Sequence, residues 1–371
     1  MNVCILSMQH VLNYGSLLQA YSLKKIISDI GHSVSFIDIK PNDHDNALRD
    51  TVVAFSEGLD STNKGFIYRL LQQDSNPLFI GNKILRKKRT THKQIDFFQK
   101  YLQSDLNDKR FDVCVIGSDE VFNYSNHDRW GFTSQLFGNV TQADKIITYA
   151  ASAGYSTENE LNQTMRDCIK QAFTRISSFS VRDLNTYNIV KSLTGSEPLI
   201  HFDPVLIGDF GLEMSGAQSV IKRFPKHYCL VYSYNGRISD SSEIKAIKAF
   251  CKKHGLIPIS VGGYQKWIHY HFDLTPFEAL VAFQNADFVI TDTFHGAIFS
   301  AKYSDRFGVV VRDSNKNKLA DLIERIEIQE HQLHHIDDLE RVFQIDKNIK
   351  GLDCKIKYER DRAISYFRSS I

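Results

Sequence analysis

A histidine between two apolar segments is the residue of this sequence best suited to acid–base chemistry. The apolar run Phe288-Val289-Ile290 is stopped by the polar segment Thr291-Asp292-Thr293, and His295-Gly296 then leads into a second apolar segment. This pattern predicts a strand, a tight turn and the first turn of a helix. Such turns lie at the carboxyl edge of a parallel sheet, where helix N-termini bind anionic groups. His295 is therefore expected to act on a ligand, because its protonation changes near neutral pH.

The neighbours of His295 are expected to support it. Asp292 lies at the end of the predicted strand and can orient the imidazole, while Thr291 or Thr293 can cap the following helix. Gly296 lets a ligand approach the backbone closely because it has no side chain. The alternative is that His295 is a structural residue of the turn, which is the commoner role of a single histidine.

Small and polar residues also follow the predicted strands in the first half of the chain, which suits a ligand site at one rim of a parallel sheet. They are Asn13, Gly15, Ser118, Asp119, Ser152, Arg182 and Asp203. Arg182 is the best candidate for binding an anion, because a guanidinium donates two parallel hydrogen bonds to carboxylate or phosphate. The structural alternatives are an ion pair between Arg182 and Asp183, and helix-capping or turn-forming roles for Asp119 and Asp203.

Length and composition favour a protein of two domains. The chain has 371 residues, of which 42% are hydrophobic and 24% charged, enough for two separate cores. A net charge of +2 gives no strong overall field, so nucleic acid is not indicated as a partner. No apolar run approaches the roughly 20 residues that span a bilayer. We therefore expect a cytoplasmic protein, at most docked at the inner face of the membrane.

Strand and helix patterns alternate through both halves of the chain and are separated by a composition break at residues 208–227. We predict an α/β fold with an N-terminal domain over residues 1–207 and a C-terminal domain over residues 208–345 that carries His295. Residues 346–371 are predicted to form a helix that can fold back across the joint. Gly15 stands alone where a dinucleotide-binding turn needs three glycines, so no nicotinamide or flavin cofactor is predicted.

Two further clusters have simple structural explanations. The basic segment Lys83–Lys93 is either a solvated helix surface or a contact with anionic lipid head groups, which attract each basic residue by roughly 1 kcal/mol. His331, His334 and His335 lack the accompanying acidic residues of a metal site, so we predict that they are exposed to solvent and that no metal is bound.

Six segments, taken in order, resemble the polysaccharide pyruvyl transferase family over about residues 1–312. They are Val11–Tyr21, Gly117–Asn123, Tyr149–Ser152, Ser180–Asp183, Asp203–Val205 and Thr291–Gly296. The resemblance implies two Rossmann-like domains that face each other across a cleft, as in GT-B glycosyltransferases. It also implies transfer of a pyruvyl group from phosphoenolpyruvate to a sugar, as a cyclic ketal, during assembly of a bacterial surface polysaccharide such as a capsule or exopolysaccharide.

The resemblance assigns roles to particular residues. The general acid of the family corresponds to His295, assisted by Asp292, and the anion-binding arginine corresponds to Arg182, with Thr293 and Gly296 beside the donor. The partners implied are phosphoenolpyruvate, as a co-substrate rather than a cofactor, and a saccharide acceptor, which can be lipid-linked. The N-terminal Rossmann-like domain, residues 1–207, is then the acceptor side. The residues expected to line the cleft there are Asn13, Gly15, Ser118, Asp119, Ser152 and Asp203.

Two other functions stay open at this point. Thr293-Phe294 stands where members with the best-defined donor site carry Arg-Leu. A GT-B-type glycosyltransferase that uses a nucleotide sugar would place a diphosphate at the helix N-termini of the second domain. A non-catalytic module that binds saccharide or anion would keep the fold without the chemistry.

Overall fold

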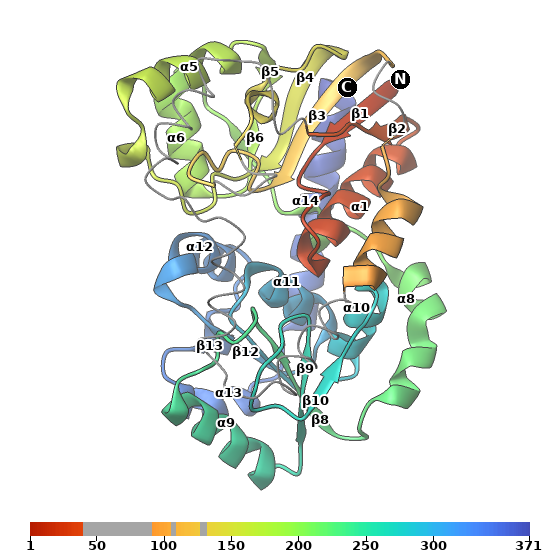
Figure 1. Cartoon of the computed structure of the whole chain (residues 1–371), viewed down its shortest axis with the longest axis vertical. Coiled ribbons are helices and arrows are strands. Elements are labelled where there is room, and N and C mark those ends of the chain that lie inside the picture. Colours follow the sequence, from red (N-terminus) through yellow and green to blue (C-terminus); the bar gives the residue numbers. More distant parts are fainter. Residues whose placement is uncertain (40–90, 105–108, 127–131) are drawn as a thin grey trace, which may run out of the picture.

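Two parallel β-sheets, one from each half of the chain, form the framework of the protein (Figure 1). The structure is a computed structural model, and it describes residues 1–39, 91–104, 109–126 and 132–371. Every strand pairing between these residues is parallel, and helices or 3₁₀ turns connect most successive strands, except β5 to β6 and β9 to β10. The predicted α/β class with two Rossmann-like units is confirmed by this topology.

The N-terminal sheet has the strand order β2-β1-β3-β4-β6-β7, with β5 paired to β4. Its central strands are apolar runs that are buried on both faces, as parallel sheets require. The strands are β1 (Asn2–Leu6), β2 (Ser33–Phe36), β3 (Phe111–Asp119), β4 (Ala143–Ala151), β5 (Ile176–Ser178), β6 (Ser180–Val181) and β7 (Leu199–Ile200). The helices are α1 (Tyr14–Asp29), α5 (Gln163–Phe173), α6 (Leu184–Thr194) and α7 (Pro204–Ile207), with 3₁₀ turns η1 (Ser134–Phe137) and η2 (Glu158–Glu160). Residues 91–101 are also helical.

The C-terminal sheet has the order β10-β9-β8-β11-β12-β13. Its strands are β8 (Tyr228–Tyr232), β9 (Ile257–Val261), β10 (Tyr270–Phe272), β11 (Phe288–Thr291), β12 (Phe307–Val310) and β13 (Gln332–Leu333). The helices are α9 (Ser241–Lys253), α10 (Pro276–Gln284), α11 (Phe294–Tyr303), α12 (Lys316–Arg325) and α13 (Leu339–Phe343), with 3₁₀ turns η4 (Asp313–Asn315), η5 (Gln329–His331) and η6 (Ile336–Asp338). His295 follows the inner strand β11 and so lies at the carboxyl edge of this sheet.

The joint between the two units is apolar and aromatic. The composition break at residues 208–227 contains α8 (Gly211–Ala217) and the 3₁₀ turn η3 (Gln218–Arg223), so it is a partly helical connection. Tyr21 of α1 lies 5.2 Å from Phe277 of α10, measured between ring centroids. Tyr14 donates a hydrogen bond to the carbonyl of Leu274 at 3.0 Å. One continuous core cluster includes residues of both sheets, so the two units pack directly on each other.

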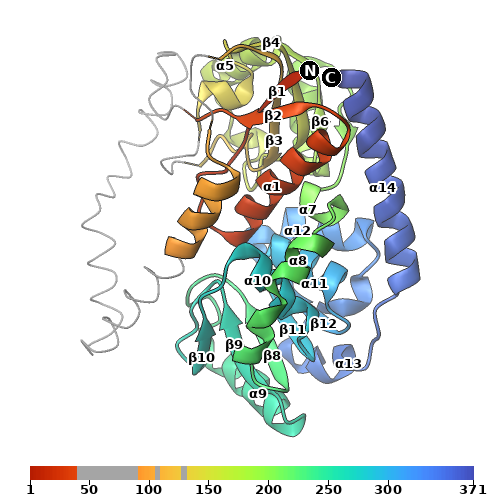
Figure 2. The same ribbon diagram turned by 90° about the vertical axis from the view of Figure 1, so that its right-hand side faces the viewer.

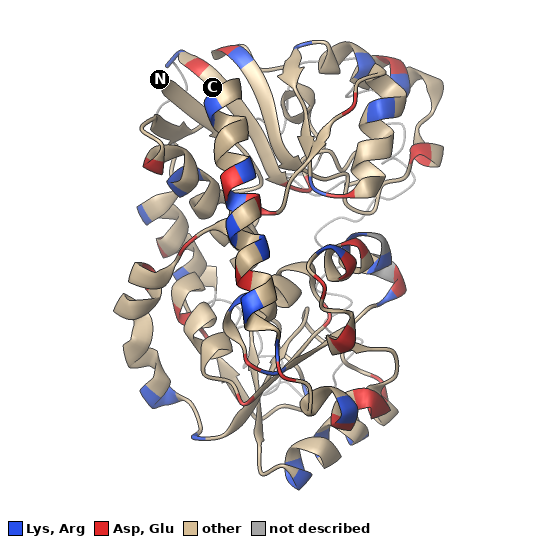
Figure 3. Ribbon diagram, turned by 180° about the vertical axis from the view of Figure 1, so that it is seen from behind, with Lys and Arg blue, Asp and Glu red and all other residues tan. Residues whose placement is uncertain are grey.

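The last helix, α14 (Ile349–Ser370), runs from the C-terminal unit back along the N-terminal one (Figure 2). Tyr366 donates a hydrogen bond to the carbonyl of Thr148 at 2.8 Å, and the ring of Phe367 lies 4.6 Å from that of Tyr149. Acidic and basic residues alternate along its outer side (Figure 3). The chain thus crosses the joint a second time, which ties the two units together.

The histidines near the C-terminus, the basic segment and the helices differ in how far they match the sequence-based predictions. His331 is buried and stacks on Phe307 at 4.1 Å, so the prediction that it is exposed was wrong, whereas His334 and His335 are exposed. Most of Lys83–Lys93 lies outside the described residues, although Lys93 forms an ion pair with Glu278 at 3.0 Å. Across the described part of the chain, no helix combines the length and apolar character that a membrane span requires.

Candidate active site

The turn after β11 positions His295 through a helix cap. Thr293 is the N-cap residue of α11, and its hydroxyl accepts a hydrogen bond from the backbone N–H of Gly296 at 3.0 Å. The predicted capping by Thr293 is therefore confirmed, and His295 occupies the first turn of the helix. A Cβ atom on Gly296 would lie 2.0 Å from Oγ1 of Thr291. Gly296 is thus required for close packing within this turn.

The imidazole of His295 reaches across the joint to the first turn of α1. A Cβ atom on Gly15 would lie 2.1 Å from Nδ1 of His295, so only glycine fits there. The first turn of α1 is fixed by Asn13, whose side-chain oxygen accepts from the N–H of Ser16 at 2.8 Å. Asn13 is therefore a helix cap, and Gly15 is a contact surface for the histidine.

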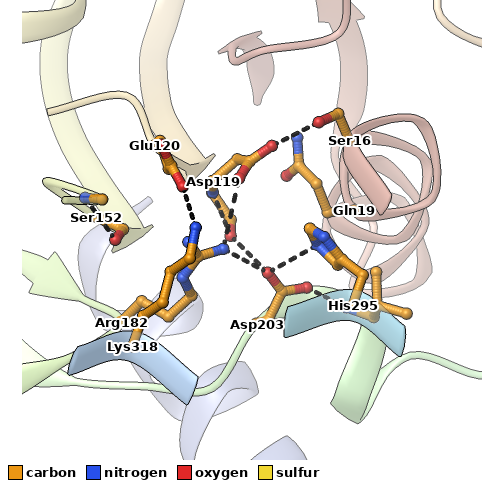
Figure 4. A network of polar contacts seen from close by, with 12 residues as sticks. Ser16, Gln19, Asp119, Glu120, Ser152, Arg182, Asp203, His295 and Lys318 are labelled. Carbon is orange, nitrogen blue, oxygen red and sulfur yellow. Dashed lines mark hydrogen bonds and ion pairs between the residues drawn. The ribbon is translucent and has the colours of Figure 1, made fainter. Parts of the chain in front are cut away.

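Asp203 is the carboxylate that connects His295 with Arg182 (Figure 4). Its Oδ2 atom accepts a hydrogen bond from Nη1 of Arg182 at 3.0 Å and lies 3.5 Å from Nε2 of His295. The hydroxyl of Ser118 donates to the same oxygen at 3.3 Å. Oδ1 accepts from the N–H of Val205 and so caps α7. Asp203 therefore performs the expected capping role and also joins the two candidate functional side chains.

Burial and ion pairing set the charge states of this group. Arg182 and Asp203 are 2% and 1% exposed. Burial alone would raise the pKa of Asp203, but the contacts with His295 and Arg182 outweigh it and lower the pKa to about 2. Burial alone would lower the pKa of Arg182, but Asp119 and Asp203 outweigh it and raise the pKa above its ordinary value. Both groups are therefore charged at neutral pH.

The end of β3 contributes a second carboxylate. Asp119 lies 3.6 Å from Nη1 of Arg182 and accepts a hydrogen bond from the hydroxyl of Ser16 at 2.6 Å. Its φ of 74° is in the left-handed region, which residues other than glycine rarely adopt. Such backbone strain is concentrated at functional sites, where surrounding contacts hold it in place.

Helix α12 of the C-terminal unit closes over these strand ends. Lys318 forms an ion pair with Glu120, which follows Asp119 at the end of β3. Nη1 of Arg325 donates to the backbone carbonyl of Arg182 at 2.6 Å, and its guanidinium lies 4.0 Å from the ring centroid of Phe202. Two cations on one helix thus contact residues that follow β3, β6 and β7.

Two of the predicted site residues have different partners from those expected. Asp292 was expected to orient His295, but its carboxylate accepts a hydrogen bond from Nε of Arg312 at 2.6 Å and lies 3.4 Å from Nε of Arg237. The carboxylate beside His295 is instead Asp203. Ser152 donates to Asp183 at 2.6 Å, and Asp183 in turn caps α6. Ser152 therefore supports the segment that carries Arg182.

Five further residues complete this cluster, and no functional role was predicted for them from the sequence. They are Ser16, Glu120, Phe294, Lys318 and Arg325, and the guanidinium of Arg182 lies 4.3 Å from the ring centroid of Phe294. Ser16, Glu120 and Phe294 adjoin residues that were predicted, so their neighbourhood was a usable signal. Lys318 and Arg325 lie on one side of α12, and no local pattern says which strand ends that side contacts.

The arrangement can bind an anion and transfer a proton. Among the described residues, Nε of Arg182 is buried and has no hydrogen-bond partner, and Nε2 of His295 is buried with only the 3.5 Å contact to Asp203. Buried polar atoms without partners are rare, and a bound ligand is one explanation for them. No group of His, Cys, Asp and Glu that could hold a metal ion was found in the part of the chain that the structure describes.

Fold and site together define a two-unit α/β protein with a buried Arg–Asp–His group at the joint. A sequence model of the family named "Polysaccharide pyruvyl transferase" matches residues 13–314. The chain belongs to the polysaccharide pyruvyl transferase family, which is a family of transferases. A search of curated protein sequences found no match.

Solved structures with a similar arrangement cover nearly the whole chain. Arabidopsis thaliana UGT89C1 complexed with UDP has 10% sequence identity and a TM-score of 0.47, with 99% of each chain covered. Methanocaldococcus jannaschii UDP-GlcNAc 2-epimerase in complex with UDP-GlcNAc and UDP has 12% identity and a TM-score of 0.49, with 99% of this chain and 100% of that chain covered.

Proposed function

We propose that this protein transfers a pyruvyl group from phosphoenolpyruvate to two hydroxyls of a sugar, forming a cyclic ketal during assembly of a bacterial surface polysaccharide. Family membership supports the transferase class and the saccharide acceptor. The observation that carries the donor and the mechanism is the Arg182–Asp203–His295 group. Asp203 contacts Nη1 of Arg182 and Nε2 of His295, while Nε of Arg182 is buried without a hydrogen-bond partner.

The reaction needs one acid and a clamp for an anionic donor. A proton must be added to the methylene carbon of phosphoenolpyruvate, which leaves a cation-like centre on the neighbouring carbon. A sugar hydroxyl attacks this centre and loses its proton, the phosphate leaves, and a second hydroxyl closes the ring with loss of another proton. His295 in its protonated form supplies the first proton and takes up one of the two released later, while the departing phosphate takes up the other.

The neighbouring side chains assist this acid. Asp203 stays ionised and lies 3.5 Å from Nε2 of His295, so it can orient the imidazole. Arg182 offers its unpartnered Nε to a carboxylate or phosphate oxygen of the donor. Phosphoenolpyruvate carries several negative charges, and Lys318 and Arg325 are further cations beside Arg182. Thr293 and Gly296 act by fixing the helix turn that carries His295.

Asp292 has a supporting role in this proposal. Its contacts with Arg312 and Arg237 hold the edge of the C-terminal sheet next to the histidine turn. The acceptor is a saccharide intermediate of the polymer, and a lipid-linked intermediate would place the enzyme at the inner face of the membrane.

Calorimetric titration tests the donor. We expect phosphoenolpyruvate to bind the purified protein, and UDP, GDP and CMP not to bind under the same conditions. Inorganic phosphate should then be released from phosphoenolpyruvate when the acceptor is supplied. Nucleotide binding without phosphoenolpyruvate binding would contradict the proposal and indicate a glycosyltransferase. Phosphoenolpyruvate binding that is unchanged by substitution of both Arg182 and His295 would show that the site lies elsewhere.

A further inference from the structure

An exposed tyrosine follows β8 at the carboxyl edge of the C-terminal sheet. Tyr234 is 57% exposed, although it belongs to the same sheet edge as the histidine turn, since β8 pairs with β11 and Thr291 lies opposite Tyr232. An exposed aromatic ring loses the free energy that burial would provide, so its position invites a functional explanation.

The loop that carries Tyr234 is held rigidly by the neighbouring loop after β9. The backbone N–H of Gly236 donates to the carbonyl of Tyr264 at 2.9 Å, and the N–H of Tyr264 donates to the side chain of Asn235 at 2.7 Å. The side chain of Gln265 donates to the carbonyl of Tyr234 at 2.8 Å. A ring on such a loop needs little further ordering when a ligand binds, which favours affinity.

An arginine lies beside the ring of Tyr234. The guanidinium of Arg237 lies 5.3 Å from the ring centroid of Tyr234, within the range of a cation–π contact. Arg237 is in turn 3.4 Å from the carboxylate of Asp292, which Arg312 also contacts. The ring is thus supported from within the protein, and more than half of the residue remains open to solvent.

Charges of both units act on the hydroxyl of Tyr234. Desolvation by the surrounding protein raises the pKa of Tyr234, with an opposing effect of Lys318 and a further raising effect of Glu120 and Asp119. Arg237, which lies beside the ring, also contacts Asp292 in the turn that leads to His295, so the tyrosine adjoins the candidate active site.

We propose that the ring of Tyr234 is the stacking platform for the acceptor saccharide, with Glu120 and Lys318 beside it to bind the hydroxyls of the sugar. This inference rests on the proposed function, because it assigns the acceptor part of the same site.

The chemistry of a sugar matches this surface. One face of a pyranose ring carries mainly C–H groups and packs on an aromatic ring, while its hydroxyls project outward at the edge and need hydrogen-bond partners. A carboxylate accepts and an ammonium group donates such bonds. Glu120 and Lys318 come from different units, so a sugar on Tyr234 would contact the end of β3 and helix α12 at once. Its hydroxyls would then point toward the donor held by Arg182.

Saturation-transfer NMR with simple sugars tests the platform. The probes are the methyl β-pyranosides of glucose, galactose and mannose, which offer neighbouring hydroxyl pairs of different geometry. The variants are Tyr234→Ala and Tyr234→Phe. Tyr358→Ala is a matched control, because Tyr358 is 63% exposed, lies on α14 and also has an arginine near its ring, with Arg362 at 6.0 Å.

We expect saturation of the ring C–H protons of at least one sugar in the wild-type protein, in Tyr234→Phe and in Tyr358→Ala. Tyr234→Ala should reduce this transfer about tenfold, the loss that corresponds to one decade in affinity. Equal transfer in Tyr234→Ala and wild type, or no transfer to any of the three sugars, would overturn the proposal. UDP is measured as a further probe. If Tyr234→Ala reduced saturation transfer to UDP but not to any of the sugars, the ring would stack on a base and the proposal would also be overturned.

Phosphoenolpyruvate binding is measured on the same samples to separate the two proposals. If the sugars contact Tyr234 and phosphoenolpyruvate does not bind, the proposed donor fails and the saccharide platform stands. If phosphoenolpyruvate binds equally to wild type and Tyr234→Ala while the sugars do not bind, the proposed donor stands and the platform fails.

Discussion

Gly15 and His295 touch across the joint between the two halves of the chain. A Cβ atom on Gly15 would lie 2.1 Å from Nδ1 of His295, far inside normal contact distance. The first turn of α1 therefore packs against the imidazole of His295, which belongs to α11. Because the two residues belong to helices of different units, packing of the two units on each other determines where the imidazole lies.

Replacing Gly15 by alanine should displace the imidazole. We expect phosphate release from phosphoenolpyruvate to fall on the order of 10²-fold, because a catalytic group displaced by about 1 Å loses its alignment. Gly216→Ala is the matched control, because a Cβ atom at Gly216 meets nothing within 4 Å. Circular dichroism should show both variants folded. Wild-type turnover in a folded Gly15→Ala protein would contradict this role of the contact.

His295→Ala should slow turnover while leaving the donor bound. Loss of a general acid typically costs 10²- to 10⁴-fold in rate, and the binding groups on Arg182 are untouched. Phosphate-release kinetics and calorimetry with phosphoenolpyruvate measure the two effects separately. His334→Ala, at an exposed histidine of the same unit, should behave like wild type. An unaltered phosphate-release rate in His295→Ala with donor binding retained would favour a non-catalytic anion- or saccharide-binding module.

Arg182→Lys should weaken donor binding roughly tenfold to a hundredfold. Lysine keeps the charge that Asp203 and Asp119 need, but it has no Nε–H to donate, and a charge-assisted hydrogen bond contributes about 1.5–3 kcal/mol. Arg182→Ala removes the charge as well and leaves a buried carboxylate unpaired, which costs about 3–5 kcal/mol of folding free energy. Calorimetry on Arg182→Lys, with Arg166→Lys at a partly exposed ion pair as the control, checks the prediction. Equal affinities of wild type and Arg182→Lys for phosphoenolpyruvate would show that Arg182 does not bind the donor.

The stability of the protein should depend on pH through Asp203. Its pKa is about 2 in the folded protein and 3.8 in the ordinary reference state. A lowered pKa means that the unfolded chain binds the proton more readily, so the stabilisation is complete above about pH 4 and is lost as the pH falls toward 2. Its size is on the order of 2 kcal/mol.

Denaturant unfolding of wild type and Asp203→Asn from pH 2 to pH 6 measures this effect. The difference in unfolding free energy between the two proteins should shrink by about 2 kcal/mol as the pH falls from 4 to 2. Asp144→Asn, at an exposed ion pair, should show no such change. A constant difference between wild type and Asp203→Asn over this range would show that the carboxylate is not held ionised by its neighbours.

Local patterns predicted the fold class and the elements that carry the site. The apolar run before Thr291 became β11, and Thr293 caps α11. These features depend on residues within a few positions of one another, so the sequence contains the information directly. The exposure predicted for His331 was wrong. Its ring stacks on Phe307 of β12, and its Nδ1 forms a hydrogen bond with the carbonyl oxygen of the same residue.

Periodicity and capping are local, so the positions of His295, Arg182, Asp203 and Gly15 at strand ends and helix starts follow from the sequence alone. Long-range contacts, in contrast, place Asp203 rather than Asp292 beside His295, and they pair Asp292 with Arg312. They also hold Lys318 and Arg325 over the N-terminal strand ends. All of these partners are distant in the sequence. The contacts of Asp203, Lys318 and Arg325 also depend on how the two units pack along an apolar joint, which no short stretch of sequence specifies.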